Sequence, residues 1–386
     1  PGEQPLGEDY AHALAQTLDA LGIERCGVFG THTGGVTATE FARLYPDRVS
    51  VVIVDGITCW TEAERADALE NYFTPFAPQW DGSHLTWLWS RMREQTIFFP
   101  WYAKTLAARM DYDVPSPDRI HNGLLEFLRA GVEYRKPYKA AFIFKGEESI
   151  LALTCPAHLM AIAPDVLFSH FDRLPALPDN IKVERFGASR SELLDRAEAV
   201  LRQYPGQPTV AGPDAPKPTP GRTWQDYATV DGGQLHMRRS GGADRPVLVQ
   251  HDAASDNNVV RLAAEGFVGK RPVIAFDLPG NGESDNTIGT DKDAITCATY
   301  AEVTRQALAS MGLDSLDYIG TWGSGFTGLE LAKMQPGLVE HLVIAHPIYH
   351  PESLRRELLA NYTPELETDW WGGYLLMCWH AMRDQG

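Results

Sequence analysis

Short apolar runs alternate along the chain with stretches in which apolar residues recur every three or four positions. The runs at 245–251, 271–277 and 341–346 have the length and composition of buried parallel strands. Helical spacing follows Tyr300 and again covers 326–334. Strands alternating with helices predict an α/β fold, with a mostly parallel central sheet and helices on both faces.

The first half of the chain has the same pattern. A strand, a turn and a helix are predicted over 26–44, and further strands over 49–56, 157–163 and 181–186. Residues 58–147 have helical spacing and are rich in aromatic side chains. We therefore expect a helical insert between two strands of the sheet.

An internal repeat organises these elements. Tyr10 aligns with Tyr300, an offset of 290 residues (300 − 10), and the alignment continues without a gap. Identical residues recur at this spacing: Gly22 and Gly312, Gly30 and Gly320, Thr31 and Thr321, Pro46 and Pro336, Trp80 and Trp370, Trp89 and Trp379. So many matches indicate a tandem duplication.

The repeat predicts two incomplete copies joined by a linker. Copy one is 1–203 and lacks its first strands; copy two is 223–386 and ends near the start of its insert; 204–222 is a linker rich in Pro and Gly. We expect a piece of a longer tandem protein. Either the early strands of copy two complete the sheet of copy one as a permuted domain, or they pair within copy two and leave copy one an open edge.

The composition disfavours several classes of binding partner. The 34 basic and 51 acidic residues give a net charge of −17, which disfavours nucleic acid and anionic membranes. Five scattered cysteines without a CxxC pair favour a reducing, cytoplasmic compartment and disfavour a disulfide framework or a zinc site. No cofactor motif is present, so we expect no cofactor. No apolar run reaches the length of a membrane span, so we expect no transmembrane helix. The sequence leaves the oligomeric state open.

Several motifs carry a resemblance. The stretch "RPVIAFDLPGNGESD" (271–285) is similar to the strand and D-x-PG-x-G-x-S turn of the α/β-hydrolase family, and "PGEQPL" at the start is similar to the end of that turn. "GTHTGG" (30–35) stands at that family's nucleophile elbow, and 58–147 stands where the family inserts its lid. The chain thus resembles an α/β-hydrolase fold with a helical lid.

The resemblance implies site residues, but with departures. His32 occupies the nucleophile position, Asp165 the position of the acid, and Asp55 an alternative acid position after the preceding strand. Ser189 or Arg190 stands where the family has its histidine. Because the elbow of copy two holds an indole (Trp322), which cannot transfer a proton, copy two is predicted to be non-catalytic.

Other candidates surround this centre. The backbone N–H of Thr33 is expected to stabilise an oxyanion, and the corresponding earlier loop survives only in copy two. These loop residues are His251 and Asp252. The predicted substrate pocket comprises Trp80, His84, Trp87 and Trp322.

Two functions remain open. In the first, the chain is a hydrolase-like enzyme for an ester, lactone or C–C bond in an apolar or aromatic small molecule, with His32 as base or nucleophile. In the second, both copies are degenerate and the protein binds a small molecule or acts as a scaffold.

Overall fold

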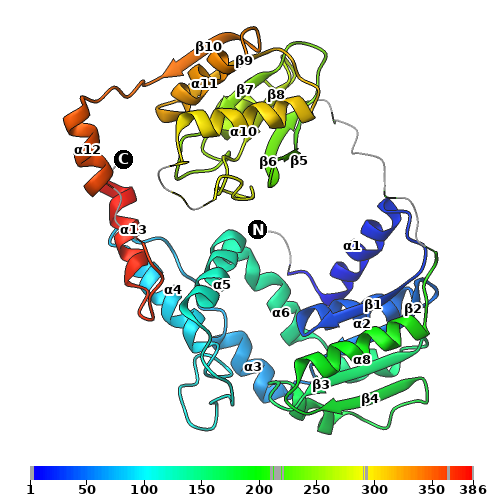
Figure 1. Cartoon of the computed structure of the whole chain (residues 1–386). Coiled ribbons are helices and arrows are strands. Elements are labelled where there is room, and N and C mark those ends of the chain that lie inside the picture. Colours follow the sequence, from blue (N-terminus) through cyan, green and yellow to red (C-terminus); the bar gives the residue numbers. More distant parts are fainter. Residues whose placement is uncertain are drawn as a thin grey trace. The chain divides into compact units, whose positions relative to one another are not determined.

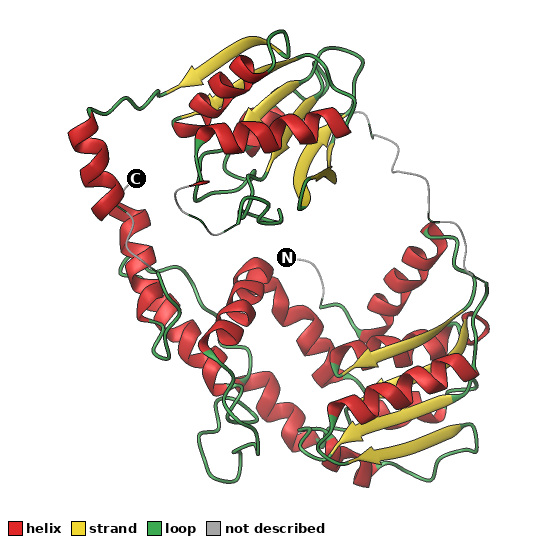
Figure 2. Ribbon diagram, in the orientation of Figure 1, coloured by secondary structure: helices red, strands yellow, loops and turns green. Residues whose placement is uncertain are grey.

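The computed structural model describes residues 4–208, 212, 219, 221–289, 291, 294–362 and 366–384 (Figure 1). The chain divides into two compact units. Unit 1 is Pro1–Asp214 with Asn361–Gly386, and unit 2 is Ala215–Ala360. Each unit alternates strands with helices (Figure 2), so the α/β class is confirmed.

Unit 1 is built on a four-stranded parallel sheet in the order β1-β2-β3-β4. Its strands are β1 (Cys26–Thr31), β2 (Val49–Asp55), β3 (Ala157–Ile162) and β4 (Ile181–Phe186). Alternate residues of β2 serve opposite faces, as the two-residue period of a strand requires. Val52 and Val54 pack with α1 (Gly7–Ala20) and α2 (Thr33–Leu44), whereas Val51 and Ile53 pack with α8 (Arg190–Gln203).

Residues 58–147 form the predicted helical insert. Its α-helices are α3 (Glu62–Asn71), α4 (Ser83–Glu94), α5 (Pro117–Ala130), α6 (Arg135–Ile143) and α7 (Gly146–Leu151). Short 3-10 turns occur at η1 (Pro46–Arg48), η2 (Gly131–Tyr134) and η3 (Phe168–Arg173). The helix α13 (Gly373–Asp384) packs on α4, and this contact places the end of copy two in unit 1 instead of with the rest of 223–386.

Unit 2 has a six-stranded mixed sheet in the order β10-β9-β7-β8-β6-β5. The strands are β5 (Thr223–Val230), β6 (Gly233–Ser240), β7 (Val247–Gln250), β8 (Val273–Phe276), β9 (Leu316–Thr321) and β10 (Val339–Ala345). The helices are α9 (Arg261–Glu265), α10 (Cys297–Ser310), α11 (Gly323–Met334) and α12 (Glu352–Asn361). The helices α10 and α11 share one apolar cluster with the sheet, and α9 shares another, so both faces are covered.

Strand pairing decides between the two arrangements of the early strands. β8 pairs with β7 and β6, and β7 pairs with β9 of its own copy. The permuted domain is therefore wrong for the described strands. Among the described strands, β1 is the repeat counterpart of β9 but has no equivalent of β7 at its side. Phe29 on β1 is 37% exposed, whereas its repeat counterpart Ile319 on β9 is partly buried against a cluster that includes Val247 and Val249 of β7.

Two segments singled out in the sequence lie partly outside the described residues. Most of the linker 204–222 lies outside the described residues, as does the beginning of "PGEQPL". The strand β5 starts directly after the linker and was not predicted, because its residues from Thr223 alternate only weakly between buried and exposed.

Candidate active site

A strained turn presents His32. β1 ends at Thr31 and α2 begins at Thr33, with His32 between them at φ 48°, ψ −111°. This positive φ is uncommon for a residue other than glycine and occurs at sites that the surrounding structure holds in place. Strand and helix approach closely here, since a Cβ on Gly30 would lie 2.3 Å from the carbonyl oxygen of Gly34. The elbow geometry is thus present although its residue is histidine.

Unit 2 repeats this backbone. Trp322 lies between β9 and α11 at φ 50°, ψ −120°. The same backbone hydrogen bond accompanies both elbows, from His32 N–H to the carbonyl oxygen of Asp55 and from Trp322 N–H to that of Ala345, each 2.9 Å. The conformation therefore belongs to the fold, and the two units differ in the side chain that it presents.

His32 bonds directly to one of the two candidate acids. Its Nε2 lies 2.8 Å from Oδ2 of Asp165, in the turn after β3. The other carboxylate oxygen of Asp165 accepts the backbone N–H of Leu167 at 2.8 Å. The Asp165 side chain is 7% exposed and that of His32 is 42% exposed. The carboxylate is fixed in the protein while the imidazole reaches solvent.

Gly56 makes room for this pair. It follows β2 with a left-handed φ of +75°, and a Cβ on it would lie 2.5 Å from Cδ2 of His32. Both the conformation and the space exclude a side chain there. The position of the imidazole therefore depends on glycine at the end of the neighbouring strand.

The charges shift the pKa values of the pair in opposite directions. Burial acts to lower the pKa of His32, but the hydrogen bond and charge of Asp165, with the charge of Asp55, outweigh it and raise that pKa. Burial acts to raise the pKa of Asp165, but the hydrogen bond and charge of His32 lower it overall. The pair thus favours an imidazolium facing a carboxylate.

Asp55 has a different partner. Its side chain is fully buried and forms an ion pair with Arg190, the first residue of α8. Thr31 Oγ1 donates to its Oδ2 at 3.4 Å, while its Oδ1 is buried with no hydrogen-bond partner in the described part of the chain. Burial raises the pKa of Asp55 against the opposing charge of Arg190. The Asp55 side chain therefore acts on the His32 imidazole through its charge and not through a hydrogen bond.

Two residues near the site escaped the sequence analysis. Arg190 was noted only as a departure from the family's histidine, and nothing in the sequence linked it to Asp55. Tyr112, in the loop of the insert, has its pKa raised by burial and by the charges of Asp165 and Asp55. This tyrosine also lines a cavity of about 500 Å³ formed by residues of the 106–113 loop. A tyrosine without a flanking motif gives no sequence signal.

The predicted oxyanion residues lie in different units. Thr33 begins α2, where the first N–H groups of a helix have no partner inside the helix. His251 belongs to unit 2, is fully buried, and accepts the Leu278 N–H at 2.9 Å, so it braces two loops there. Asp252 directs its carboxylate at the start of α11, because a Cβ on Gly323 would lie 2.7 Å from its Oδ1. A carboxyl group therefore lies beside the first residue of α11 in unit 2.

The predicted pocket residues are dispersed. Trp80 is 77% exposed, and His84 is buried against Trp379 of α13. Trp87 packs among the aromatic side chains of the insert, with Phe76 and Trp101 among its neighbours. The half-exposed Trp322 belongs to unit 2. Within unit 1, Trp80, His84 and Trp87 therefore contact groups other than His32.

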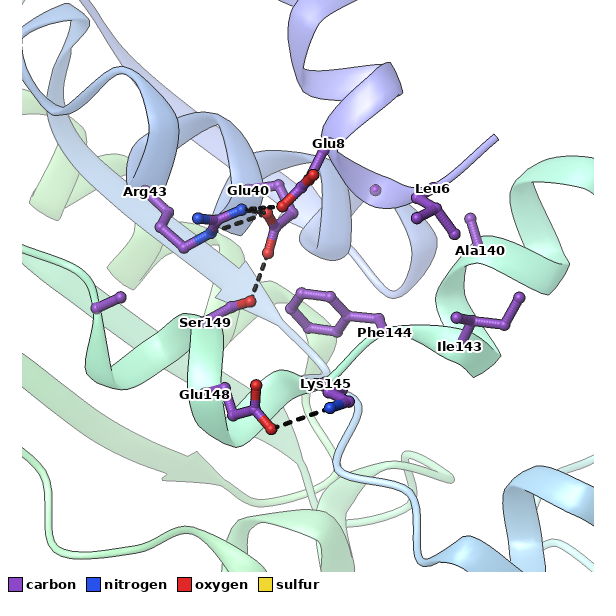
Figure 3. A pocket seen from close by; sticks show the side chains of 12 residues that line it. Leu6, Glu8, Glu40, Arg43, Ala140, Ile143, Phe144, Lys145, Glu148 and Ser149 are labelled. Atoms are coloured by element: carbon purple, nitrogen blue, oxygen red, sulfur yellow. Dashed lines mark hydrogen bonds and ion pairs between the residues drawn. The ribbon is translucent and has the colours of Figure 1, made fainter. Parts of the chain in front are cut away.

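A separate cavity of about 420 Å³ lies between α1, α2, α6 and α7 (Figure 3). Its wall carries the buried carboxylate of Glu40, which accepts from Arg43 and from Ser149 Oγ. Phe144 faces the same space. Because Glu40 is already paired and His32 is not in the wall, this cavity is separate from the elbow.

The described residues hold no group of three or more His, Cys, Asp or Glu side chains arranged for a metal ion. Among the same residues, no helix has the length and apolar character needed to cross a membrane.

Comparison with known proteins gives short or partial matches. No family model matches the chain. Homoserine O-acetyltransferase of Thermus thermophilus is 48% identical over 46 residues, 12% of this chain and 12% of that protein. Homoserine O-succinyltransferase of Burkholderia pseudomallei is 50% identical over 44 residues, 11% of this chain and 12% of that protein. The chain thus matches about an eighth of the length of these curated relatives.

Solved structures also give partial matches. Cfl2 from Burkholderia cenocepacia is 21% identical with a TM-score of 0.30, covering 36% of this chain and 51% of that chain. Haloalkane dehalogenase DbeA from Bradyrhizobium elkani is 21% identical with a TM-score of 0.32, covering 37% and 51%. Because each match is partial, the substrates named for α/β-hydrolase fold proteins belong to those proteins.

Proposed function

We propose that unit 1 is a hydrolase-like enzyme in which His32 is the general base and Asp165 holds it. The observation that carries the proposal is the 2.8 Å contact between an imidazole on a strained elbow and a buried carboxylate. A histidine kept in a costly backbone conformation and paired with an acid has the features of a proton-transfer group. The Asp55 side chain, paired with Arg190, contributes charge and not a hydrogen bond to the imidazole.

The hydrogen bond assigns the two ring nitrogens. Nε2–H donates to Asp165, which leaves Nδ1 to accept a proton; Nδ1 has no hydrogen-bond partner among the described residues. In the neutral form, Nδ1 removes a proton from a water molecule while the water oxygen bonds to the carbonyl carbon of the substrate. The Thr33 N–H at the start of α2 stabilises the oxyanion. Collapse breaks the bond to the leaving group, which takes the proton from Nδ1.

The substrate class proposed is an ester, a lactone or a cleavable C–C bond in an apolar or aromatic molecule. The support is the aromatic insert, whose loop brings Tyr112 within range of the charges of Asp165 and Arg190. Much of the remaining aromatic surface packs on itself around Tyr72 and Trp101. The substrate side of the proposal therefore rests on the 106–113 loop.

The test is turnover of p-nitrophenyl esters of graded chain length and of aromatic lactones. His32→Gln is expected to reduce the rate by about 10²- to 10⁴-fold, the usual contribution of a general base. His158→Gln is the matched control, since His158 also pairs with a carboxylate of unit 1, Glu184, at 2.5 Å. Equal rates in wild type and His32→Gln would refute the proposal. A fluorophosphonate probe should leave the elbow unlabelled.

A second function is favoured by the charges. The raised pKa of His32 makes the imidazolium more abundant, and in unit 2 the Asp252 carboxyl group lies beside the start of α11. Under this alternative the chain binds an anionic or polar small molecule at the elbow without converting it. Thermal stabilisation by a ligand, lost in His32→Gln and accompanied by no product, would favour binding over catalysis.

A further inference from the structure

Two tryptophans exchange equivalent hydrogen bonds between α4 and α13. The indole N–H of Trp89 donates to the carbonyl oxygen of Trp370 at 3.2 Å. The indole N–H of Trp379 donates to the carbonyl oxygen of Trp80 at 2.9 Å. Trp89 and Trp379 occupy the same position in the two copies, and so do Trp80 and Trp370. In each copy the indole N–H therefore donates to the equivalent tryptophan carbonyl oxygen of the other copy.

The aromatic contacts are reciprocal as well. The ring of His84 meets that of Trp379 edge-on, at 4.8 Å between centroids and 82° between planes. The ring of Tyr374 meets that of Trp89 in the same way, at 5.6 Å and 87°. His84 and Tyr374 are repeat counterparts. Each therefore places its ring against the tryptophan of the other copy, as the hydrogen bonds do.

Glycines complete the pattern. Gly82 and Gly372 are repeat counterparts with left-handed φ values of +77° and +72°. A Cβ on Gly82 would lie 2.7 Å from Cδ1 of Trp379, and a Cβ on Gly372 would lie 2.5 Å from Cγ of Trp89. Each glycine thus forms the floor on which the other copy's indole lies, and neither place admits a side chain.

Reciprocal contacts between equivalent positions define a two-fold, self-complementary interface. The groups that make it are the same in both copies: a tryptophan carbonyl, a glycine and an indole N–H. We propose that residues 80–94 form a homotypic docking surface whose partner is a second copy of the same element, and that residues 370–384 fill it within this chain. Two α4 elements, or two α13 elements, have the groups needed for the same bonds.

The pairing inside the chain has further contacts. Tyr374 OH lies 2.5 Å from Nδ1 of His121 on α5, and Leu375 joins the buried cluster around Leu88 and Leu124. The intact chain therefore keeps α13 on α4 and leaves no free homotypic surface. Removing one of the two elements frees the other to pair with a second chain.

The test is the mass of full-length variants by size exclusion with light scattering. Gly372→Val with Trp379→Ala disables α13, and the surface on α4 is then expected to pair between chains and double the mass relative to wild type. Gly82→Val with Trp89→Ala disables α4 and is expected to double the mass through α13. All four substitutions together remove both surfaces and should restore the wild-type mass.

Controls separate this pairing from misfolding. Trp379→Phe keeps the ring and loses one hydrogen bond, so it should retain the wild-type mass. Circular dichroism identifies any variant that fails to fold. In that case Gly372→Ala alone replaces the half-disabled variant and is expected to double the mass. Gly372→Ala together with Gly82→Ala replaces the four-substitution variant and is expected to keep the wild-type mass. Half-disabled variants that keep the wild-type mass would overturn the proposal. So would a doubled mass or open-ended aggregation that persists in the four-substitution variant.

Discussion

Replacing Asp165 by Asn removes the charge that faces His32 and keeps the shape of the side chain. The Asn oxygen can still accept Nε2–H across the 2.8 Å contact, so the loss is that between a charged and a neutral hydrogen bond, about 1 kcal/mol or somewhat more. Because the imidazole is 42% exposed, solvent screening keeps this loss of hydrogen-bond free energy at about 1 kcal/mol. If the loss falls on the transition state, the rate drops about fivefold.

The pH dependence gives a sharper measurement than the rate. In the wild type the pKa of His32 is raised, because the hydrogen bond and charge of Asp165, with Asp55, outweigh burial. In Asp165→Asn, burial and Arg190 are opposed only by Asp55, so the pKa falls. Under the proposed mechanism the base works in its neutral form, so activity should rise with pH through this pKa. The midpoint of the activity profile, and of the His32 imidazole signal in an NMR titration, should therefore move to lower pH.

Stability should follow the same linkage. A raised histidine pKa gives stability that is complete below the ordinary value of about 6.5 and is lost as pH rises through the folded value. The lowered pKa of Asp165 gives stability that is lost only at acid pH. Urea unfolding should thus show Asp165→Asn more destabilised at pH 5.5 than at pH 9. An unmoved or raised midpoint, with equal destabilisation at both pH values, would refute the reasoning.

Three further predictions concern the neighbours of this pair. Gly56→Ala forces a Cβ toward the His32 ring in a left-handed backbone, so it should reduce turnover together with a loss of about 1 kcal/mol in urea unfolding. Arg190→Ala leaves the buried Asp55 without its ion pair and should lower the unfolding free energy by about 1–3 kcal/mol, more at pH 8 than at pH 5, because the carboxylate can protonate at low pH; a pH-independent loss would contradict this. Trp322→Ser should not create a probe-reactive serine, since a carboxylate already lies at the start of the following helix, and labelling at that serine would disprove the account.

The sequence by itself determined the strands, the elbows and the repeat. Buried strands such as 271–277 are visible because burial on both faces requires continuous apolar residues. The elbow at His32 is visible because the close approach of strand and helix requires small residues around it. The 290-residue period needs no structure at all. The pattern did not predict β5, whose residues alternate irregularly between buried and exposed.

Only the tertiary structure decided which groups meet. The sequence offered His32 two acids, Asp165 at the family's acid position and Asp55 as the alternative. The pairing depends on the turn after β3, which holds Asp165, and on the start of α8, which pairs Arg190 with Asp55. Trp80 and His84 were expected around a substrate, yet they contact α13, because two copies of one element fit each other. Periodicity records which residues are buried. It carries no information on which distant residue covers them, and that is where the chemistry of this chain is decided.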